Sequence, residues 1–443
     1  MSSAAPAATR RWWQRHQRGL FLIASGLSIA GSFAGITAKG WILLQGTRNP
    51  MVLALHFGAL ALPSLVASGP AGVLTDRLGA EVVLIRAQLG LLLAAATAAV
   101  ALPLLQGGPQ VLMLLLSTLA IGVASSYELT ARNKYCALLV DEPHQLARYL
   151  TSFSVVFNVG KLVGPPLGGW LVAVTTPTTA LAIDASSYLL PLAAVVWLLR
   201  PNNQAERRSD GSSRGSSLRL AWSSCGATLR HVLRFTALAC LVGFFHPGLA
   251  PIIAAEVVGP GPQDLGLFTS VLAAGSVCGG LVLQRHSPWL SRWPGLLLGG
   301  CTLLTALAQL GMAATRSTPL SLAMTFLIGA GTASLLAGVN LISQMGAPME
   351  LRGRMAGLGQ IAFLGGGGLS GLLAAVLSQQ IGLRACFGLL GGLGLLLGCL
   401  EIWKRGRLRL PSAAAGETTI SGPSAGAEPE RLGGGGSNQP DAP

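Results

Sequence analysis

Apolar stretches of about 20 residues, separated by short polar or basic segments, make up most of this sequence. A helix of about 20 apolar residues spans the hydrocarbon core of a bilayer. The pattern therefore predicts an all-α membrane protein with twelve transmembrane helices, at approximately 20 to 44, 51 to 75, 82 to 105, 110 to 132, 149 to 173, 177 to 199, 235 to 258, 264 to 284, 294 to 314, 318 to 343, 355 to 378 and 383 to 403.

One long connection and an internal sequence repeat divide these helices into two pseudo-symmetric halves. The connection is rich in Arg, Ser and Gly, which is typical of a flexible linker. The frame from Gly72 to Arg77, after the second span, recurs from Gly280 to Arg285, after the eighth, and transporters are often built from such repeats. We expect an N-terminal segment at 1–19, a six-helix bundle at 20–199, a linker at 200–234, a second six-helix bundle at 235–404 and a disordered tail at 405–443.

Composition and charge exclude a soluble protein. Of the 443 residues, 51% are hydrophobic and only 10% are charged, and the net charge is +14. Among the 30 Lys and Arg residues, Lys39 and Lys161 fall within spans, and Arg48, Arg316 and Arg384 fall on the side opposite to the N-terminus. The positive-inside rule then predicts a multi-pass protein of the cell membrane with both termini in the cytoplasm. The basic residues lie at the ends of apolar segments, and none is interleaved with aromatic ones in a groove-like pattern, so we expect no nucleic-acid partner.

The sequence lacks the common signatures of metal sites and enzymes. Its seven cysteines are scattered, without a CxxC pair or a His/Cys pair at metal spacing, and no HExxH frame occurs. Gly160-Lys161 does not end a phosphate loop, because Leu162 replaces the required Ser or Thr. We expect no metal, no cofactor and no enzymatic activity.

The stretch from Asn158 to Gly169, NVGKLVGPPLGG, carries the strongest candidate chemistry. At about 100° per residue, Asn158, Lys161 and Pro165 share one helical stripe, and Gly160, Gly164 and Gly168 share an adjacent one. The glycines allow another helix to approach closely, and the proline tends to bend the helix. A lysine in hydrocarbon must face a cavity or a counter-charge. Lys161 is therefore either part of a substrate or proton-coupling site or the partner of one structural carboxylate.

Further titratable residues lie within the spans. Lys39 either lines the cavity or extends toward the outer headgroups. Asp184 either carries a proton or pairs with Lys39 or with helix-end donors, and we favour the pairing. His246, which precedes Pro247, is either a proton relay or an ordinary hydrogen-bonded histidine.

Two pairs at the cytoplasmic ends are candidates for gating. Glu128 and Arg132 are four residues apart, a spacing that allows an ion pair within one helix. Asp76 and Arg77 lie between Gly72 and Gly79. The helix dipole would favour an acid beside a helix N-terminus there, and the acid would hold a cytoplasmic gate closed. The alternative is a plain tight turn.

These residues carry a resemblance to the major facilitator superfamily, and within it to the branch of the enterobactin exporter and related drug exporters. The resemblance covers residues 18–404. Gly72, Asp76, Arg77 and Gly79 match the motif between helices 2 and 3, and the antiporter motif of helix 5 is matched by Gly160, Gly164, Pro165, Gly168 and Gly169. The branch resembles this chain also at Ala131, Arg132, Asn158, Lys161 and Asp184.

Together, these features and the resemblance predict a secondary transporter that works by alternating access. We expect a monomeric, proton-coupled exporter of a small organic molecule that is siderophore-like, lipophilic or drug-like. The alternatives are an importer or lipid-type facilitator of the same fold, and a membrane sensor or scaffold without transport.

Overall fold

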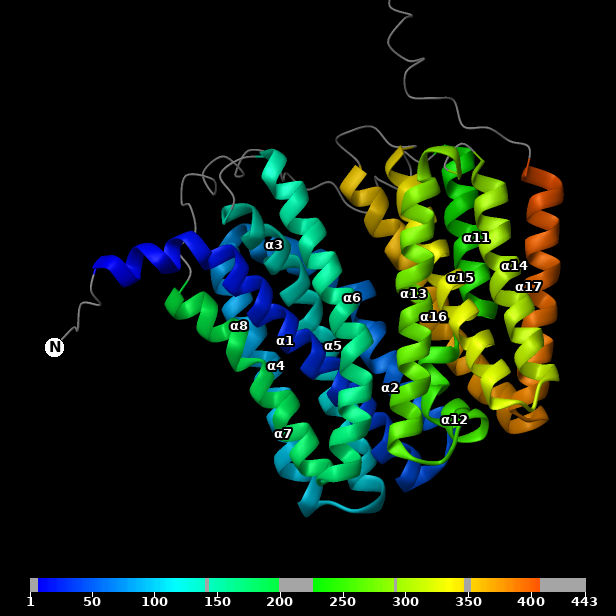
Figure 1. Ribbon diagram of the computed structural model, residues 1–443, viewed down its shortest axis with the longest axis horizontal. Helices are drawn as coiled ribbons and strands as arrows, with labels where there is room; N and C mark the ends of the chain where they lie inside the picture. The colour runs from blue at the N-terminus through cyan, green and yellow to red at the C-terminus, as the bar shows by residue number, and fades with distance from the viewer. Residues whose placement is uncertain (1–6, 140–142, 199–225, 291–292, 346–351, 407–443) are drawn as a thin grey trace, which may run out of the picture. The chain divides into compact units, whose positions relative to one another are not determined.

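The computed structural model describes residues 7–139, 143–198, 226–290, 293–345 and 352–406, which belong to one compact unit, Met1–Leu410. Nearly all of these residues are helical (Figure 1). Most of the predicted tail at 405–443 and most of the predicted linker at 200–234 lie outside the described residues, and Arg405 still belongs to the last helix.

Two bundles, one from each half of the chain, make up the described part. The N-terminal bundle contains α1 (Ala7–Thr47), α2 (Pro50–Ala61), α3 (Pro63–Leu78), α4 (Ala80–Ala101), η1 (Leu102–Leu104), α5 (Gly107–Leu138), α6 (Pro143–Val174), α7 (Pro177–Ser187), α8 (Leu189–Ala193) and η2 (Ala194–Leu198). The C-terminal bundle contains α11 (Ala227–Gly243), α12 (His246–Val257), α13 (Pro262–Leu290), α14 (Pro294–Ala314), α15 (Thr318–Met345), α16 (Arg352–Ile381) and α17 (Leu383–Arg405).

The predicted twelve-helix membrane fold is confirmed. Within the described residues, 12 helical segments are long and apolar enough to cross a bilayer. Several boundaries differ from the sequence prediction, and two differ most. Helix α1 begins at Ala7, inside the predicted N-terminal segment, and α11 begins at Ala227, inside the predicted linker. In both places a basic, polar stretch continues a helix beyond the apolar run, and hydropathy alone does not register such an extension.

Three spans are interrupted, although the apolar pattern predicted continuous helices. The second span changes helix at Leu62, the sixth at Tyr188 and the seventh at Phe244–Phe245. Each interruption is followed within three residues by a proline: Pro63, Pro191 and Pro247. Proline lacks the backbone N–H and collides with the preceding turn, so a helix tends to break just before it.

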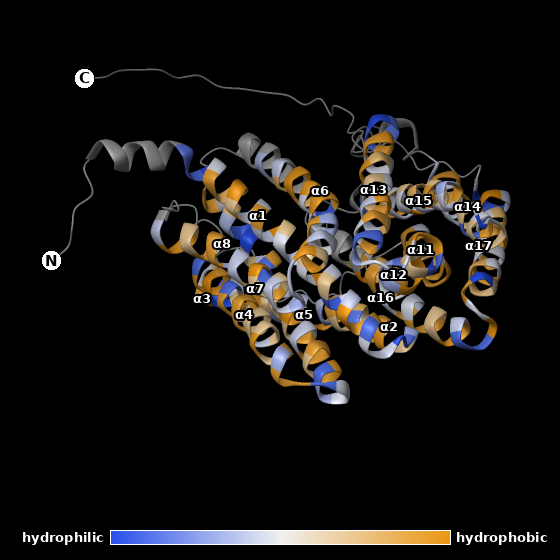
Figure 2. Ribbon diagram, turned by 60° about the horizontal axis from the view of Figure 1, so that its bottom comes forward, coloured by the Kyte–Doolittle hydropathy of each residue, from blue (hydrophilic) through white to orange (hydrophobic). Residues whose placement is uncertain are grey.

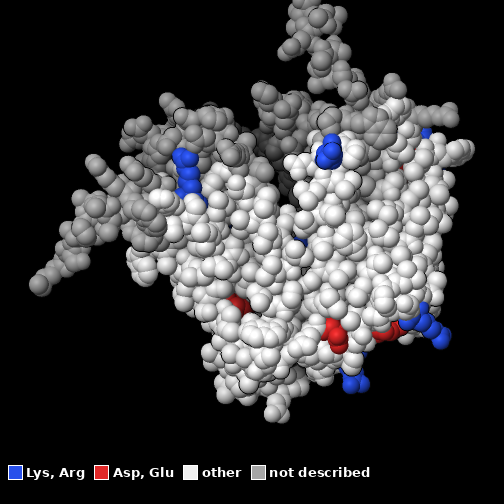
Figure 3. All heavy atoms as spheres, in the orientation of Figure 1, with Lys and Arg blue, Asp and Glu red and all other residues white. Residues whose placement is uncertain are grey.

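The surface and the interior follow the membrane environment. Large apolar side chains such as Leu93, Leu116 and Trp403 are more than half exposed, as expected of residues that face lipid. Figure 2 shows hydrophobic residues along most of each helix, with hydrophilic ones at helix ends and at isolated positions within the helices. In Figure 3 the described charged side chains lie mainly toward the top and bottom of the face in view, with a broad uncharged band between them.

The two bundles contact each other through a few helices. Helix α6 packs against α13, and α2 packs against α12 and α16. Gln379 donates a hydrogen bond to Asn49 Oδ1 across the bundles, with a distance of 2.8 Å between Nε2 and Oδ1. We call this end of the protein, which also holds Arg48, Arg316 and Arg384, the Arg48 end.

Candidate functional site

A cavity of about 130 Å³ lies between the two bundles. Helices α1, α2 and α6 supply its N-terminal wall. Helices α12, α13 and α15, together with the break after α11, supply its C-terminal wall. Its lining consists of Phe33, Ile36, Thr37, Phe57, Leu60, Lys161, Pro165, Phe244, His246, Pro247, Ala250, Thr269, Leu272, Ser276, Ile328 and Thr332. A chamber shared by both bundles is the position where ligands of two-bundle transporters bind.

Lys161 reaches this cavity from the middle of α6 and is partly exposed there. It forms no hydrogen bond or ion pair with any residue that the structure describes, so the structural carboxylate considered from the sequence is not among them. Asn158, one turn earlier on α6, is half-buried and is not part of the lining. The predicted stripe therefore brings Lys161 and Pro165 to the cavity, but not Asn158.

The glycines of α6 pack against α1. A Cβ atom on Gly160 would lie 2.6 Å from the Ile29 side chain, and one on Gly164 would lie 2.6 Å from the Ala30 carbonyl oxygen. On Gly168 it would collide with the backbone of Ala34. The adjacent stripe predicted from the sequence is thus a close helix–helix contact within the N-terminal bundle, and it orients α6 so that Lys161 faces the cavity.

A second contact of α6 joins the bundles at the Arg48 end. A Cβ atom on Gly266 of α13 would lie 3.0 Å from the Pro165 carbonyl oxygen and 3.1 Å from the Pro166 Cα. On Gly169 it would collide with the Pro262 carbonyl oxygen. Main chain therefore lies directly against main chain, beside the cavity. We call this contact, between Pro165–Gly169 and Pro262–Gly266, the glycine clasp.

The interruption of the seventh span shapes the opposite wall. His246 is the first residue of α12 and is buried, with its ring stacked on Phe245 at a centroid distance of 4.2 Å. It was predicted within a continuous span. Instead, it begins a new helix after the break and lines the cavity.

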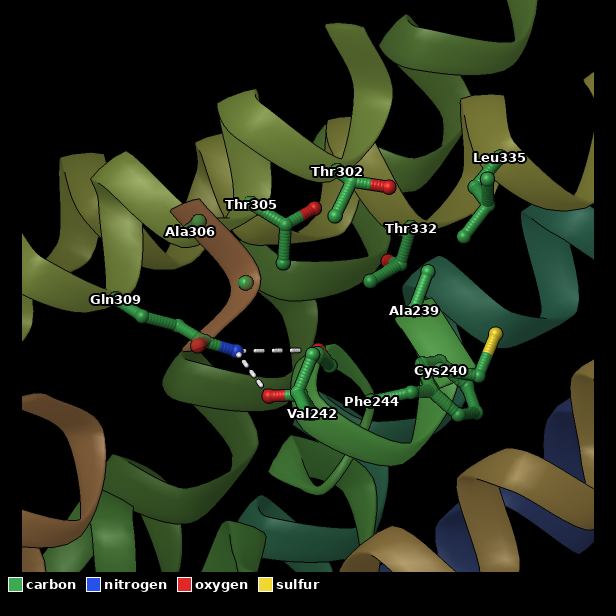
Figure 4. A pocket seen from close by; sticks show the side chains of 12 residues that line it. Ala239, Cys240, Val242, Phe244, Thr302, Thr305, Ala306, Gln309, Thr332 and Leu335 are labelled. Carbon is green, nitrogen blue, oxygen red and sulfur yellow. Dashed lines mark hydrogen bonds between the residues drawn. The ribbon is translucent and has the colours of Figure 1, made fainter. Parts of the chain in front are cut away.

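Gln309 of α14 supports this break, and sequence reasoning missed it. Its Nε2 donates to the carbonyl oxygens of Val242 and Gly243, at 3.4 and 3.3 Å (Figure 4). The C-terminal carbonyls of a helix lack partners within that helix, so the amide compensates for the interruption. A glutamine in an apolar span, opposite a span that carries a proline, was the only available signal.

A small second cavity of about 10 Å³ adjoins this break, and Thr302, Thr305 and Gln309 lie in its wall (Figure 4). Its volume is about that of one water-sized probe. Phe244 and Thr332 belong to the walls of both cavities. Within the described part of the chain, no other side chain belongs to both linings.

Lys39 and Asp184 lie in a buried polar cluster behind the N-terminal wall. Lys39 is 2% exposed and its Nζ donates to Ser117 Oγ at 3.1 Å. The prediction that Lys39 extends to the headgroups is therefore wrong, and Lys39 is not part of the cavity lining either. The hydrogen bond to Ser117 keeps the Lys39 ammonium inside the bundle, where a hydroxyl takes the place of water as its partner.

Asp184 of α7 is 3% exposed, and Gly35 of α1 provides the space for its carboxylate. The Lys39 ammonium donates to Ser117, and within the described part of the chain no ion pair joins it to Asp184, so the pairing of Asp184 with Lys39 or with helix-end donors stays a prediction. The two charges remain close enough to attract each other. His56 of α2, which sequence reasoning missed, adds a hydrogen bond of 3.1 Å between its Nδ1 and Thr118 Oγ1.

The gating candidates form ion pairs within the N-terminal bundle. Arg132 and Glu128 pair at 3.0 Å, as their spacing predicted. Asp76 pairs with Lys134 of α5, also at 3.0 Å. Asp76 lies in the last turn of α3, so its predicted place beside a helix N-terminus is wrong: α3 continues to Leu78 before it turns.

The remaining residues of that motif form a turn. Gly79 has φ +87°, a conformation that glycine adopts readily, and it links α3 to α4. Arg77 precedes it in the last turn of α3, and Gly72 lies in α3 with open space around its Cα. The helix dipole favours a basic residue such as Arg77 at this C-terminal end.

Comparisons with known proteins agree with this architecture. Residues 14–425 match the family described as transmembrane secretion effector. The multidrug efflux pump Tap of Mycolicibacterium fortuitum is 28% identical over 402 residues, which cover 87% of this chain and 94% of that pump.

Solved structures show the same fold. A crystal structure of the nucleoside transporter NupG has a TM-score of 0.70 at 12% identity and covers 87% of this chain and 99% of its own. A bacterial homologue of the lysosomal transporter Spinster, in an inward-facing and occupied conformation, has a TM-score of 0.69 at 16% identity and covers 90% and 99%. The chain therefore belongs to the transmembrane secretion effector family, in the drug-exporter branch of the major facilitator superfamily, and is a membrane transporter rather than an enzyme.

Proposed function

We propose that this transporter exports small organic molecules from the cell by alternating access and that protons moving inward drive the export. The observation that carries the proposal is the cavity that both bundles line, closed beside the Arg48 end by the glycine clasp. A carrier must expose one central site to each side of the membrane in turn. The similarity to a multidrug efflux pump supports export of more than one cargo.

The proposed orientation has both termini in the cytoplasm and the Arg48 end outside. Basic residues such as Arg77, Lys134 and Lys404 lie at the end opposite to Arg48, which supports this assignment by the positive-inside rule. In that orientation the glycine clasp closes the outer side. The two bundles, proposed at 20–199 and 235–404, would rock about the cavity and open the clasp to release cargo.

Roles for the candidate residues follow from their positions. Lys161, in the cavity wall, is proposed to contact the cargo, with His246 opposite. Asp184 is proposed to carry the coupling proton, because one of its carboxylate oxygens is buried without a partner among the described residues. An uncompensated buried charge is costly, so a change in protonation there would alter the balance between conformations.

The proposed gates lie at the cytoplasmic end. The Asp76–Lys134 pair links α3 to α5. The Glu128–Arg132 pair links two successive turns of α5. They are proposed to keep the N-terminal bundle rigid while it moves as one body.

Transport in inside-out vesicles tests the proposal. Vesicles with an acidic lumen should accumulate ethidium, benzoate or another member of a panel of cationic, neutral and anionic aromatic probes, and dissipating the pH gradient should stop the accumulation. Lys161→Ala should reduce the accumulation of an anionic probe such as benzoate at least tenfold, whereas Lys404→Ala, which changes an exposed lysine at a helix end, should leave it unchanged. Accumulation only in right-side-out vesicles would indicate import and contradict the proposal.

A further inference from the structure

The cavity between the bundles has an unbalanced charge. Among the residues that the structure describes, Lys161 is the only Lys or Arg in its lining, and none of these lining residues is acidic. The described carboxylates are engaged elsewhere or lie at helix ends. They comprise Asp76 with Lys134, Glu128 with Arg132, Glu256 with Arg384, Glu401 with His231, Asp264 with the Gly261 amide, Asp184 in the cluster near Lys39, and Glu81 in the first turn of α4.

Lys161 is also the main donor that the cavity can offer. The hydroxyl groups in the lining are already used, since each donates to a carbonyl of its own helix. The pairs are Thr37 with Phe33, Thr269 with Leu265, Ser276 with Leu272 and Thr332 with Ile328, at 2.7 to 3.0 Å. A hydroxyl that donates within its helix retains only acceptor capacity toward a ligand. An anion would therefore find its charged partner in Lys161.

The rest of the wall suits a flat apolar body. The rings of Phe33, Phe57 and Phe244 line the cavity, and Phe57 and Phe244 meet edge to face at a centroid distance of 6.4 Å. Aromatic rings in a ligand pack well in such arrangements. An apolar cavity of about 150 Å³ is known to bind benzene, so a volume of about 130 Å³ accommodates about one aromatic ring.

A cation in this cavity would meet the ammonium of Lys161 without any acid in the described lining to offset the repulsion. A neutral cargo would leave that ammonium without a counter-charge. An organic anion supplies the charge that the wall lacks, and charge-assisted hydrogen bonds of this kind are about twice as strong as neutral ones.

We propose that the cavity selects organic monoanions with a flat apolar body of about one aromatic ring, and that Lys161 recognises their negative charge. An aromatic carboxylate is the simplest case. This inference rests on the proposed function, because it treats the cavity as the cargo site.

Three near-isosteric probes test the sign of the selectivity: benzoate, benzamide and benzamidine carry charges of −1, 0 and +1. The full-length protein in lipid nanodiscs, with empty nanodiscs as the blank, is titrated with each probe by saturation-transfer NMR, which detects weak binding. We expect benzoate to bind at least tenfold more tightly than benzamidine, with benzamide between them. Equal affinities, or tighter binding of benzamidine, would overturn the inference without need of any variant.

Variants then assign the selectivity to one residue. In Lys161→Met the affinity for benzoate should fall to within twofold of the affinity for benzamide. Lys161→Arg should keep the preference for benzoate. Lys404→Met should bind all three probes as the wild type does. A preference that survives in Lys161→Met would contradict the role of Lys161.

The outcomes also separate this inference from the proposed export. Vesicles that accumulate ethidium through a protein that does not bind benzoate would leave export standing and overturn the anion preference. Benzoate binding that depends on Lys161, in a protein that moves no probe, would support the anion preference and contradict export.

Discussion

Replacement of Gly266 by alanine should shift the protein away from the conformation described here. The new methyl group would lie 3.0 Å from the Pro165 carbonyl oxygen and 3.1 Å from the Pro166 Cα, in the glycine clasp between the bundles. Both neighbours are backbone atoms, so no side chain can rotate to relieve the contact. The clasp must widen by a few tenths of an ångström or open.

The magnitude follows from this overlap. Overpacking by a methyl group where neighbours cannot move aside costs about 1–3 kcal/mol. The penalty applies only while the clasp is closed, so it acts on the balance between conformations. A change of 1.4 kcal/mol is tenfold in an equilibrium constant, and the ratio of open to closed protein should therefore rise by roughly 5- to 150-fold. Gly169→Ala, from the other side of the clasp, should act in the same direction.

Double electron–electron resonance spectroscopy can measure the ratio of open to closed protein. Spin labels at Thr179 and Arg316, both exposed at the Arg48 end on different bundles, would be placed in a variant without native cysteines. The matched control is Gly280→Ala, also in α13, where a methyl group would meet nothing within 4 Å. It accounts for the general preference of helices for alanine. A distance distribution for Gly266→Ala that equals that of Gly280→Ala would refute the reasoning.

Three further predictions concern stability, measured by thermal unfolding of the purified protein. Gly164→Ala should lower the free energy of unfolding by about 1–3 kcal/mol, because the new methyl group overpacks the contact with α1. Gly300→Ala, with open space around it, should lower it by nothing. Equal thermal midpoints of the two variants would contradict the close contact. Gln309→Leu should cost about 1–3 kcal/mol, because it leaves two carbonyls of the seventh span without their donor, and an unchanged midpoint would remove Gln309 from that role. Glu128→Gln alone should lower the free energy of unfolding by about 3–5 kcal/mol, because it leaves the Arg132 charge buried without its partner. The double variant with Arg132→Met should lose clearly less, because the second change removes that charge. Additive losses would argue against the buried pair.

The sequence was sufficient to predict the features that have a strong periodic signal. The twelve apolar runs led to twelve spans, and the glycine and proline spacing of α6 placed Lys161 on a face distinct from the packing glycines. Both follow from local regularities, namely the length needed to cross a bilayer and the 100° turn per residue.

The remaining features depend on contacts between residues far apart in the chain. Lys39 was predicted without knowledge of Ser117, which lies 78 residues later and provides its hydrogen bond. Asp76 was assigned to a loop because Gly79 marks a turn, but α3 holds its helical form until Leu78. Gln309 gave only a weak local signal, a glutamine within an apolar span, since its importance comes from an interruption in another span.

Phe244 has a consequence for the range of cargo. Among the described lining residues, this ring and Thr332 are the two that both cavity walls contain, and the ring lies closely against Gly367, whose missing side chain leaves it room. We therefore expect the position of this ring to decide whether the two cavities are connected. If the main cavity binds cargo as proposed, a larger side chain at Gly367 should restrict the Phe244 ring and narrow the range of cargo shapes without changing Lys161.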